Sequence, residues 1–138
     1  MNSYTFNDLY VGLSSSFNIK IDLNISKNFI NICKDTNPLH VDSEYAKNKG
    51  FKDKLIHGML TSSFYSTLVG MYLPGKYSIL HSIKINFSKP VYINELLNVY
   101  GEIVFINKAY KQIEMKAYIK NDKEKISKAI IKIGLLHD

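Results

Sequence analysis

The segment Asp35-Thr36-Asn37-Pro38-Leu39-His40 contains the two side chains of this chain that are best suited to acid–base chemistry. A carboxylate and an imidazole on either side of a proline turn can approach one point and share a water molecule. Asp35 falls where a short helix is expected to end. The negative end of the helix dipole disfavours the carboxylate anion there and makes it a better base. The segment is therefore a candidate for the activation of water.

The same residues are also ordinary turn chemistry. Asp and Asn side chains form hydrogen bonds with their own backbone, and proline fixes the backbone angle φ. Taken alone, Asp35, Asn37 and Pro38 therefore leave two interpretations open, a capped turn and an acid–base pair.

A second informative segment, Ile56-His57-Gly58-Met59-Leu60, opens a long uncharged stretch. Gly58 leaves its backbone N–H open to close approach, and a helix N-terminus there would supply free donors for a developing oxyanion. Ser62 and Ser66 follow at helical spacing on the same face, although buried helical serines also simply bond back to the preceding turn. His57 could be catalytic, but a hydrogen-bonded histidine at a helix start is the preferred interpretation.

The elements that must position these residues can be predicted from the spacing of apolar side chains. Residues 55–75 carry no Asp, Glu or Lys but are too polar for a membrane span, which predicts a helix surrounded by protein. A short helix capped by Ser26 is expected to stop before Pro38, and another runs from Ser43 to Gly50. Alternation of apolar and polar residues predicts strands over 17–23, 79–87, 97–105, 113–119 and 129–135.

These elements predict an α+β fold in which an antiparallel sheet of about five strands wraps around one long central helix, with short helices in the first half. Strands with one apolar face need a cover, and an uncharged helix needs surrounding protein. This arrangement is the hot-dog architecture. At 138 residues, we expect residues 1–138 to form a single domain.

The amino-acid composition indicates which classes of binding partner and which cellular compartment to expect. The net charge is +6, but the 18 basic residues are all lysine, so the guanidinium fork that reads phosphates and guanine edges is missing. We therefore expect no nucleic-acid partner and no membrane partner. Cys33 is the single cysteine, which excludes an internal disulfide and a paired-cysteine metal site. With no secretory signal evident at the N-terminus, we expect a cytoplasmic protein.

Taken together, the motifs resemble the MaoC-like (R)-specific enoyl-CoA hydratases, which have the hot-dog fold. The resemblance covers residues 17–136, with several separate motifs in the family's order and spacing. It is carried by Asp35-Thr36-Asn37-Pro38-Leu39-His40, Tyr45-Ala46, Ile56-His57-Gly58-Met59-Leu60, Leu73-Pro74-Gly75 and Phe87-Ser88-Lys89-Pro90-Val91.

The resemblance implies a hydro-lyase that reversibly hydrates trans-2-enoyl thioesters to (R)-3-hydroxyacyl thioesters. Asp35 and His40 match the family's water-activating pair, and Gly58 matches the glycine whose N–H polarises the thioester carbonyl. Ser66 matches a serine that supports the aspartate, and Asn37 is a further supporting residue. No metal and no cofactor are implied, apart from the CoA or acyl-carrier phosphopantetheine that is part of the substrate.

The resemblance also implies a homodimer whose acyl groove forms between subunits. Two alternatives keep the fold: a hot-dog acyl-thioesterase, and a non-catalytic protein that binds acyl thioesters. Hot-dog thioesterases usually carry Asp or Glu on or beside the central helix, and residues 55–75 have neither. The chain also lacks the proline that often precedes Ile56, and it has no arginine for nucleotide phosphates, so CoA and acyl-carrier protein both stay open as carriers.

Overall fold

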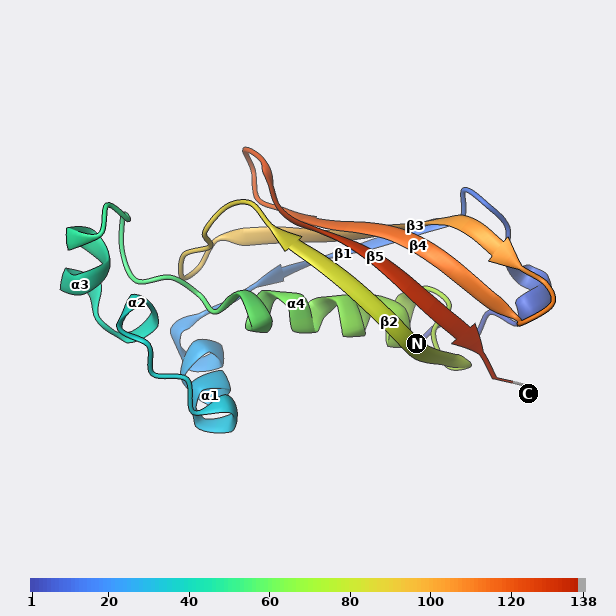
Figure 1. Ribbon diagram of the computed structural model, residues 1–138, viewed down its shortest axis with the longest axis horizontal. Coiled ribbons are helices and arrows are strands. Elements are labelled where there is room, and N and C mark those ends of the chain that lie inside the picture. Colours follow the sequence, from blue (N-terminus) through green and yellow to red (C-terminus); the bar gives the residue numbers. More distant parts are fainter. Residues whose placement is uncertain (137–138) are drawn as a thin grey trace.

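The computed structural model describes residues 1–136. A five-stranded sheet lies over one helix, and three short helices project beyond one end of that helix (Figure 1). In chain order the elements are η1 (Phe6–Asp8), β1 (Ser14–Lys20), α1 (Leu23–Cys33), α2 (Pro38–Val41), α3 (Ser43–Asn48), α4 (Gly58–Thr67), η2 (Leu68–Tyr72), β2 (Ser78–Phe87), β3 (Leu96–Asn107), β4 (Gln112–Lys120) and β5 (Lys125–Leu135).

The strands lie in the order β1-β3-β4-β5-β2, and every neighbouring pair is antiparallel. β1 and β2 are therefore the two edges of the sheet. In β3, β4 and β5 the side chains alternate so that one buried apolar face lies toward α4. The predicted α+β hot-dog fold, with five strands around a central helix, is confirmed.

The first strand differs from its prediction in its bounds. The sequence predicts a strand over 17–23, but β1 ends at Lys20 and α1 already begins at Leu23. The reason is a cap: the Asp22 carboxylate accepts a hydrogen bond of 2.8 Å from the Ile25 N–H and starts the helix. Ser26, predicted as the cap, lies instead inside α1 and is buried, so that prediction is wrong.

The central helix is shorter than the predicted stretch 55–75. α4 begins at Gly58, and after Thr67 the chain continues as the π-type turn η2. The two residues before His57 are held in an extended segment, because the Leu55 N–H donates to the Leu39 carbonyl and the Ile56 N–H donates to the Val91 carbonyl, each at 2.8 Å. The segment before α4 is therefore hydrogen-bonded both to α2, through Leu39, and to the connection between β2 and β3, through Val91.

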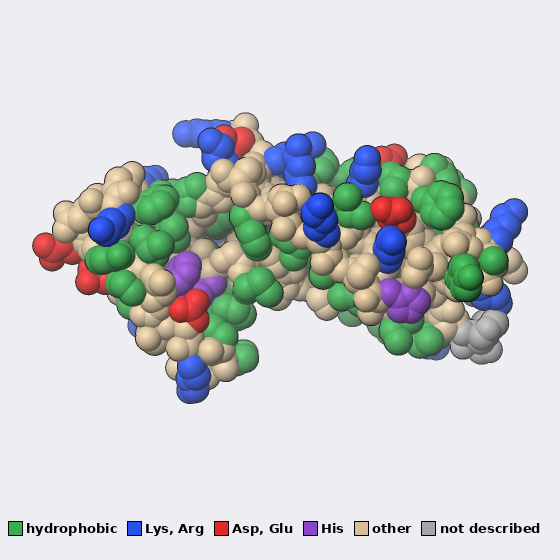
Figure 2. Space-filling model, in the orientation of Figure 1, with side chains coloured by type: hydrophobic (Ala, Val, Ile, Leu, Met, Phe, Trp, Pro, Cys, Tyr) green, Lys and Arg blue, Asp and Glu red, His purple; other side chains and the backbone are tan. Residues whose placement is uncertain are grey.

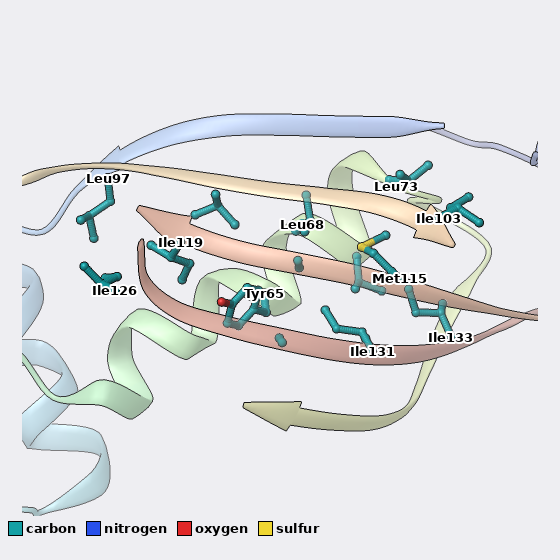
Figure 3. Packing of buried hydrophobic residues seen from close by; sticks show 14 of the residues in the cluster. Tyr65, Leu68, Leu73, Leu97, Ile103, Met115, Ile119, Ile126, Ile131 and Ile133 are labelled. Atoms are coloured by element: carbon teal, nitrogen blue, oxygen red, sulfur yellow. The ribbon is translucent and has the colours of Figure 1, made fainter. Parts of the chain in front are cut away.

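The core lies between α4 and the inner face of the sheet (Figure 3). Tyr65 and Leu68 point up from the helix layer into side chains of β3, β4 and β5, among them Met115 and Ile131. Gly101 permits this close approach: a Cβ there would lie 2.7 Å from the Leu68 side chain. Each of these buried apolar side chains stabilises the fold by about 1.5–3 kcal/mol. None of the helices within residues 1–136 combines the length and the apolar composition that a transmembrane helix requires.

One polar pair joins the helix to the sheet inside this core. The Tyr65 and Ser127 hydroxyls are hydrogen-bonded at 2.8 Å. Burial raises the pKa of Tyr65 to about 12, and its hydrogen bonds to Ser127 and the Ile119 backbone offset part of that rise. Tyr65 is therefore a neutral phenol that anchors α4 to β5.

We expect Tyr65→Phe to lower the free energy of unfolding by about 1–2 kcal/mol, because the Ser127 hydroxyl would stay buried without its partner. Urea denaturation followed by circular dichroism measures the change. Tyr110→Phe, at a ring that is 80% exposed, is the control and should have no effect. The double variant Tyr65→Phe/Ser127→Ala should recover part of the loss. Full additivity of the two single losses would contradict the pairing.

Candidate functional site

Three ionisable side chains gather where the short helices meet the start of α4. Donor atoms of Asp35, His40 and His57 all lie within 4.8 Å of one another. Figure 2 shows histidine side chains (purple) next to an acidic one (red) at this junction. The structure thus brings together Asp35 and His40, the two residues that the sequence singled out, and adds His57 to them. The cluster offers one carboxylate and two imidazoles, which is the chemistry of proton transfer and also that of a metal site.

Local turn geometry fixes Asp35. α1 ends at Cys33, and Lys34 takes the left-handed conformation with φ of 61°. One carboxylate oxygen of Asp35, Oδ1, then accepts a hydrogen bond of 3.0 Å from the Asn37 N–H. The other oxygen, Oδ2, faces His57 at 3.7 Å from its Nε2. The capped-turn interpretation is therefore correct for one oxygen of this carboxylate, and the second oxygen is still available.

Asn37 positions His40 by starting α2. Its side-chain oxygen accepts a hydrogen bond of 3.0 Å from the Leu39 N–H, and Pro38 occupies the first turn of this short helix. The preceding helix stops before Pro38, as predicted, and Pro38 itself begins a new helix. Because of that turn, the half-buried His40 side chain points back toward α4 and not into solvent.

Each ring nitrogen of His40 has a distinct role. Nδ1 lies 2.8 Å from the Leu55 carbonyl oxygen. A carbonyl can only accept, so Nδ1 carries the proton and the neutral ring keeps a lone pair on Nε2. The Leu55 carbonyl therefore fixes both the tautomer and the orientation of the imidazole.

His57 lies between the other two residues and is 3% exposed. Its Nε2–H donates to the Asp35 backbone carbonyl at 2.9 Å, and its ring stacks on that of His40 with centroids 3.8 Å apart. Phe29 packs against the His57 ring at 5.2 Å. The other nitrogen, Nδ1, is buried and has no hydrogen-bond partner among the described residues. The expected helix-start histidine is thus hydrogen-bonded through one nitrogen, and it also contacts both members of the predicted pair.

Gly58 is the first residue of α4, so its N–H has no partner within the helix. A Cβ at this position would lie 2.9 Å from the ring of Phe87, at the end of β2. The missing side chain therefore lets Phe87 pack against the helix start. It also leaves the backbone of Gly58 on the surface of the cavities at this site.

Two cavities meet at His40, Gly58 and Phe87, which line both of them. Their volumes are about 350 and 270 Å³. The larger is bounded mainly by apolar side chains, and the smaller contains the Asp35 and His57 side chains. An elongated apolar molecule with a polar group near its middle fits this shape, with the polar group at the N-terminus of α4. The larger cavity is also lined by Phe51, Leu55, Ile56, Thr61, Ser88, Lys89, Pro90, Val91 and Ile126.

Ser66 does not join this cluster in the described chain. It is exposed two turns along α4 and lines neither cavity, so its supporting role stays a prediction. Ser62, on the same helix face, donates to the Gly58 carbonyl at 2.8 Å, which is the back-bonding alternative.

Cys33 is a residue whose position the sequence did not indicate. It is the last residue of α1, and its thiol is exposed and lines the smaller cavity beside Phe29 and Asp35. Its spacing of four residues from Phe29 places both on one face of α1, which is the signal that could have indicated this.

Known proteins resemble this chain in sequence and in structure. A model of the MaoC like domain family matches residues 15–125. The (R)-specific enoyl-CoA hydratase of Rhodospirillum rubrum is 36% identical over 90 residues, which are 65% of this chain and 62% of that relative. A mitochondrial 3-hydroxyacyl-[acyl-carrier-protein] dehydratase of Arabidopsis thaliana is 38% identical over 69 residues, which are 50% of this chain and 40% of that relative.

The matched segments thus span less than two thirds of the length of these two relatives. Among solved structures, an (R)-hydratase from A. caviae involved in PHA biosynthesis superposes with a TM-score of 0.87 and 25% identity. That superposition covers 92% of this chain and 97% of the other.

Proposed function

The chain belongs to the MaoC-like domain family, and on that premise we propose that it is a hydro-lyase acting on acyl thioesters. It would add water reversibly to a trans-2-enoyl thioester to give the (R)-3-hydroxyacyl thioester. The observation that carries this proposal is the meeting of Asp35 and His40 beside the Gly58 N–H at the start of α4. Relatives named (R)-specific enoyl-CoA hydratase and 3-hydroxyacyl-[acyl-carrier-protein] dehydratase support it.

The reaction needs a proton acceptor and a proton donor at neighbouring carbons. In the hydration direction, Asp35 and His40 hold one water molecule, and one of them takes its proton as the oxygen attacks C3. The C2=C3 electron pair moves toward the thioester carbonyl, and the side chain that took the proton from water then passes it to C2. The sum is one H and one OH added across the double bond. Asp35 Oδ2 and the His40 Nε2 lone pair are the two groups available for this exchange.

Gly58 would stabilise the charge that develops on the thioester oxygen. Its N–H lies at the positive end of α4, where a partner for the enolate oxygen costs no reorganisation. Such a donor is typically worth about 3–4 kcal/mol of transition-state stabilisation. With the carbonyl at Gly58, the acyl chain and the pantetheine arm of CoA or of an acyl-carrier protein would extend along the two cavities that meet there.

The addition of water changes no oxidation state, so we propose that the reaction needs no cofactor beyond the carrier. We propose the same for metal ions, although Asp35, His40 and His57 include the donor types that a metal ion takes. Proton transfer by the two side chains and one backbone donor suffices for each step.

Asp35→Asn and His40→Gln should each lower kcat for hydration of crotonyl-CoA by about 10²–10⁴-fold, because each removes a proton-transfer group. Loss of absorbance of the conjugated thioester measures the rate. The matched control is Asp122→Asn, at an exposed turn between β4 and β5, which should leave the rate unchanged.

Four results would contradict the proposal or one part of it. Wild-type rates in both variants would remove Asp35 and His40 from the chemistry. Release of free CoA thiol from saturated butyryl-CoA would indicate a thioesterase, and tight binding of crotonyl-CoA without turnover would indicate a binding protein. Loss of activity with EDTA, restored by a divalent cation, would contradict the metal-free step.

We propose in addition that His57 is a positioning residue for this pair. Its Nε2–H holds the Asp35 backbone and its ring supports that of His40, yet neither of these contacts needs His57 itself to touch the substrate. Glutamine places an amide N–H near the position of histidine Nε2, whereas leucine fills similar volume without a donor.

His57→Leu should therefore lower kcat at least tenfold with little change in KM, and His57→Gln should restore most of that kcat. The reason is that the hydrogen bond from residue 57 to the Asp35 carbonyl sets the position of the Asp35 carboxylate. A misplaced carboxylate slows the chemical step but does not weaken the binding of the substrate. Steady-state kinetics with crotonyl-CoA measures both constants. Equal losses in the Leu and Gln variants, with equal losses of thermal stability, would indicate a packing role only.

The edge strand β2 supports the proposal of a homodimer. Its free side presents unpaired backbone groups, and Ile79 and Ile83 are 45% and 36% exposed along it. Exposed, apolar edge strands favour pairing with another chain. A two-fold axis beside β2 would join two sheets edge to edge and cover these side chains.

Ile79→Lys/Ile83→Lys should therefore shift the molar mass in sedimentation velocity from that of a dimer to that of a monomer, because it places charge in the interface. Ile32→Lys, at a 79% exposed position on α1, is the control and should stay dimeric. A wild-type protein that sediments as a monomer would contradict the proposal directly.

A further inference from the structure

A second hollow lies on the outer face of the sheet, away from α4. Its volume is about 450 Å³, and four lysines from three strands surround it. Met115 on β4 and Ile131 on β5 are fully buried on the inner face of the sheet. Because side chains alternate along a strand, their chain neighbours Lys116 and Ile130 point to the outer face. The lysines are Lys84 on β2, Lys116 on β4, and Lys125 and Lys128 on β5. In Figure 2, lysines (blue) gather along the side of the molecule that the sheet forms.

The charge of this lysine hollow is not balanced within the described chain. Among residues 1–136, none of its four lysines forms an ion pair, and Glu102 is the one acidic residue of its lining. Lys125 is held instead over the ring of Tyr118 at 4.4 Å, and that ring stacks on Tyr100. Like charges held together without partners favour the approach of an anionic surface.

An exposed apolar centre accompanies the charges. Ile130 is 39% exposed and lies between Lys84 and Lys116, since both are its direct partners across the sheet. Together with the stacked Tyr100 and Tyr118 rings it forms an apolar patch with an ammonium rim. An apolar centre with a charged rim is the composition of a protein-binding surface.

The lysine hollow adjoins the entrance of the proposed active site. Phe87, which lines both site cavities, follows Lys84 by three residues along β2, and Ile126, which lines the larger cavity, follows Lys125 in β5. Ser88 ties these strand ends together, because its hydroxyl contacts the Lys125 and Ile126 carbonyls at 3.2 Å each. In Figure 1 the same ends of β2 and β5 lie over the N-terminal end of α4.

We propose that this surface docks an acyl-carrier protein through an acidic helix, and that the carrier delivers its thioester past Phe87 to the site. This proposal rests on the proposed hydro-lyase function, and it specifies acyl-carrier protein as the carrier of the thioester substrate. Acidic side chains one turn apart on a helix are about 5–6 Å apart, which is close to the spacing of about 5–7 Å between side chains on one sheet face. Lysines offer point charges that suit separate carboxylates, whereas a nucleotide's phosphates are recognised best by the arginine fork that the chain lacks.

The test is the charge reversal Lys116→Glu/Lys128→Glu, assayed with crotonyl-acyl-carrier protein and with crotonyl-CoA. We expect KM for the carrier-protein substrate to rise at least tenfold, with kcat unchanged and both constants for crotonyl-CoA within twofold of wild type. The matched control is Lys20→Glu/Lys108→Glu, which changes net charge equally at exposed positions outside the lysine hollow. The control should leave KM for both substrates unchanged.

Unchanged KM for the carrier protein would overturn the proposal, and equal increases for both substrates would indicate a nucleotide site or a disturbed fold instead. Fluorescence anisotropy of labelled holo-acyl-carrier protein, without an acyl group, separates docking from catalysis. If the wild-type protein binds the carrier and the variant binds it more weakly, but the wild-type protein hydrates no substrate, the hydro-lyase function is contradicted and the docking surface is not. Hydration of crotonyl-CoA without any carrier binding would contradict the docking alone.

Discussion

Two histidines cross-link the loop that follows α1 to the segment that precedes α4, and the site depends on this reciprocal connection. His40, on the short helix α2 after that loop, bonds to the Leu55 carbonyl, while His57, just before α4, bonds to the Asp35 carbonyl. The two rings stack on each other with centroids 3.8 Å apart. Each such bond contributes only about 1 kcal/mol. Together they fix the carboxylate, one imidazole tautomer and the first turn of α4 relative to one another.

This connection matters because the short helices bury few residues, namely Ser26 in α1, Ala46 in α3 and none in α2. They project beyond the sheet (Figure 1), and the Asp35 side chain is 51% exposed in the described chain. A carboxylate on an exposed loop would otherwise sample many positions, and proton transfer needs it within hydrogen-bond reach of one point. The extended segment before α4 is tied in turn to Val91 by its own backbone. Residues 55–57 therefore connect the loop that carries Asp35 to Val91 through hydrogen bonds, and these bonds restrict the motion of the loop.

The sequence was sufficient for features that depend on periodicity and local turn chemistry. Alternating strands, an uncharged central helix and the approach of Asp35 to His40 all follow from spacing, and the structure contains them. It was insufficient where a tertiary contact decides. β1 ends early because Asp22 caps the next helix, and α4 starts late because backbone pairing extends residues 55–57. The hydrogen-bonded helix-start histidine expected at His57 is present, but its partner could not be predicted, since the Asp35 carbonyl lies 22 residues earlier in the chain.

The C-terminal end of β2 contributes residues to the helix start, to both site cavities and to the lysine hollow. Phe87 terminates the exposed edge strand, packs against Gly58 and lines both cavities. A side chain at position 58 would therefore displace this ring, so the absence of a Cβ sets the edge strand and the helix N-terminus at once. Lys84 and Asn86, on the other face of the same strand, belong to the lysine hollow. Because strand residues alternate between faces, a small shift of β2 would move the cavity wall and the outer surface together.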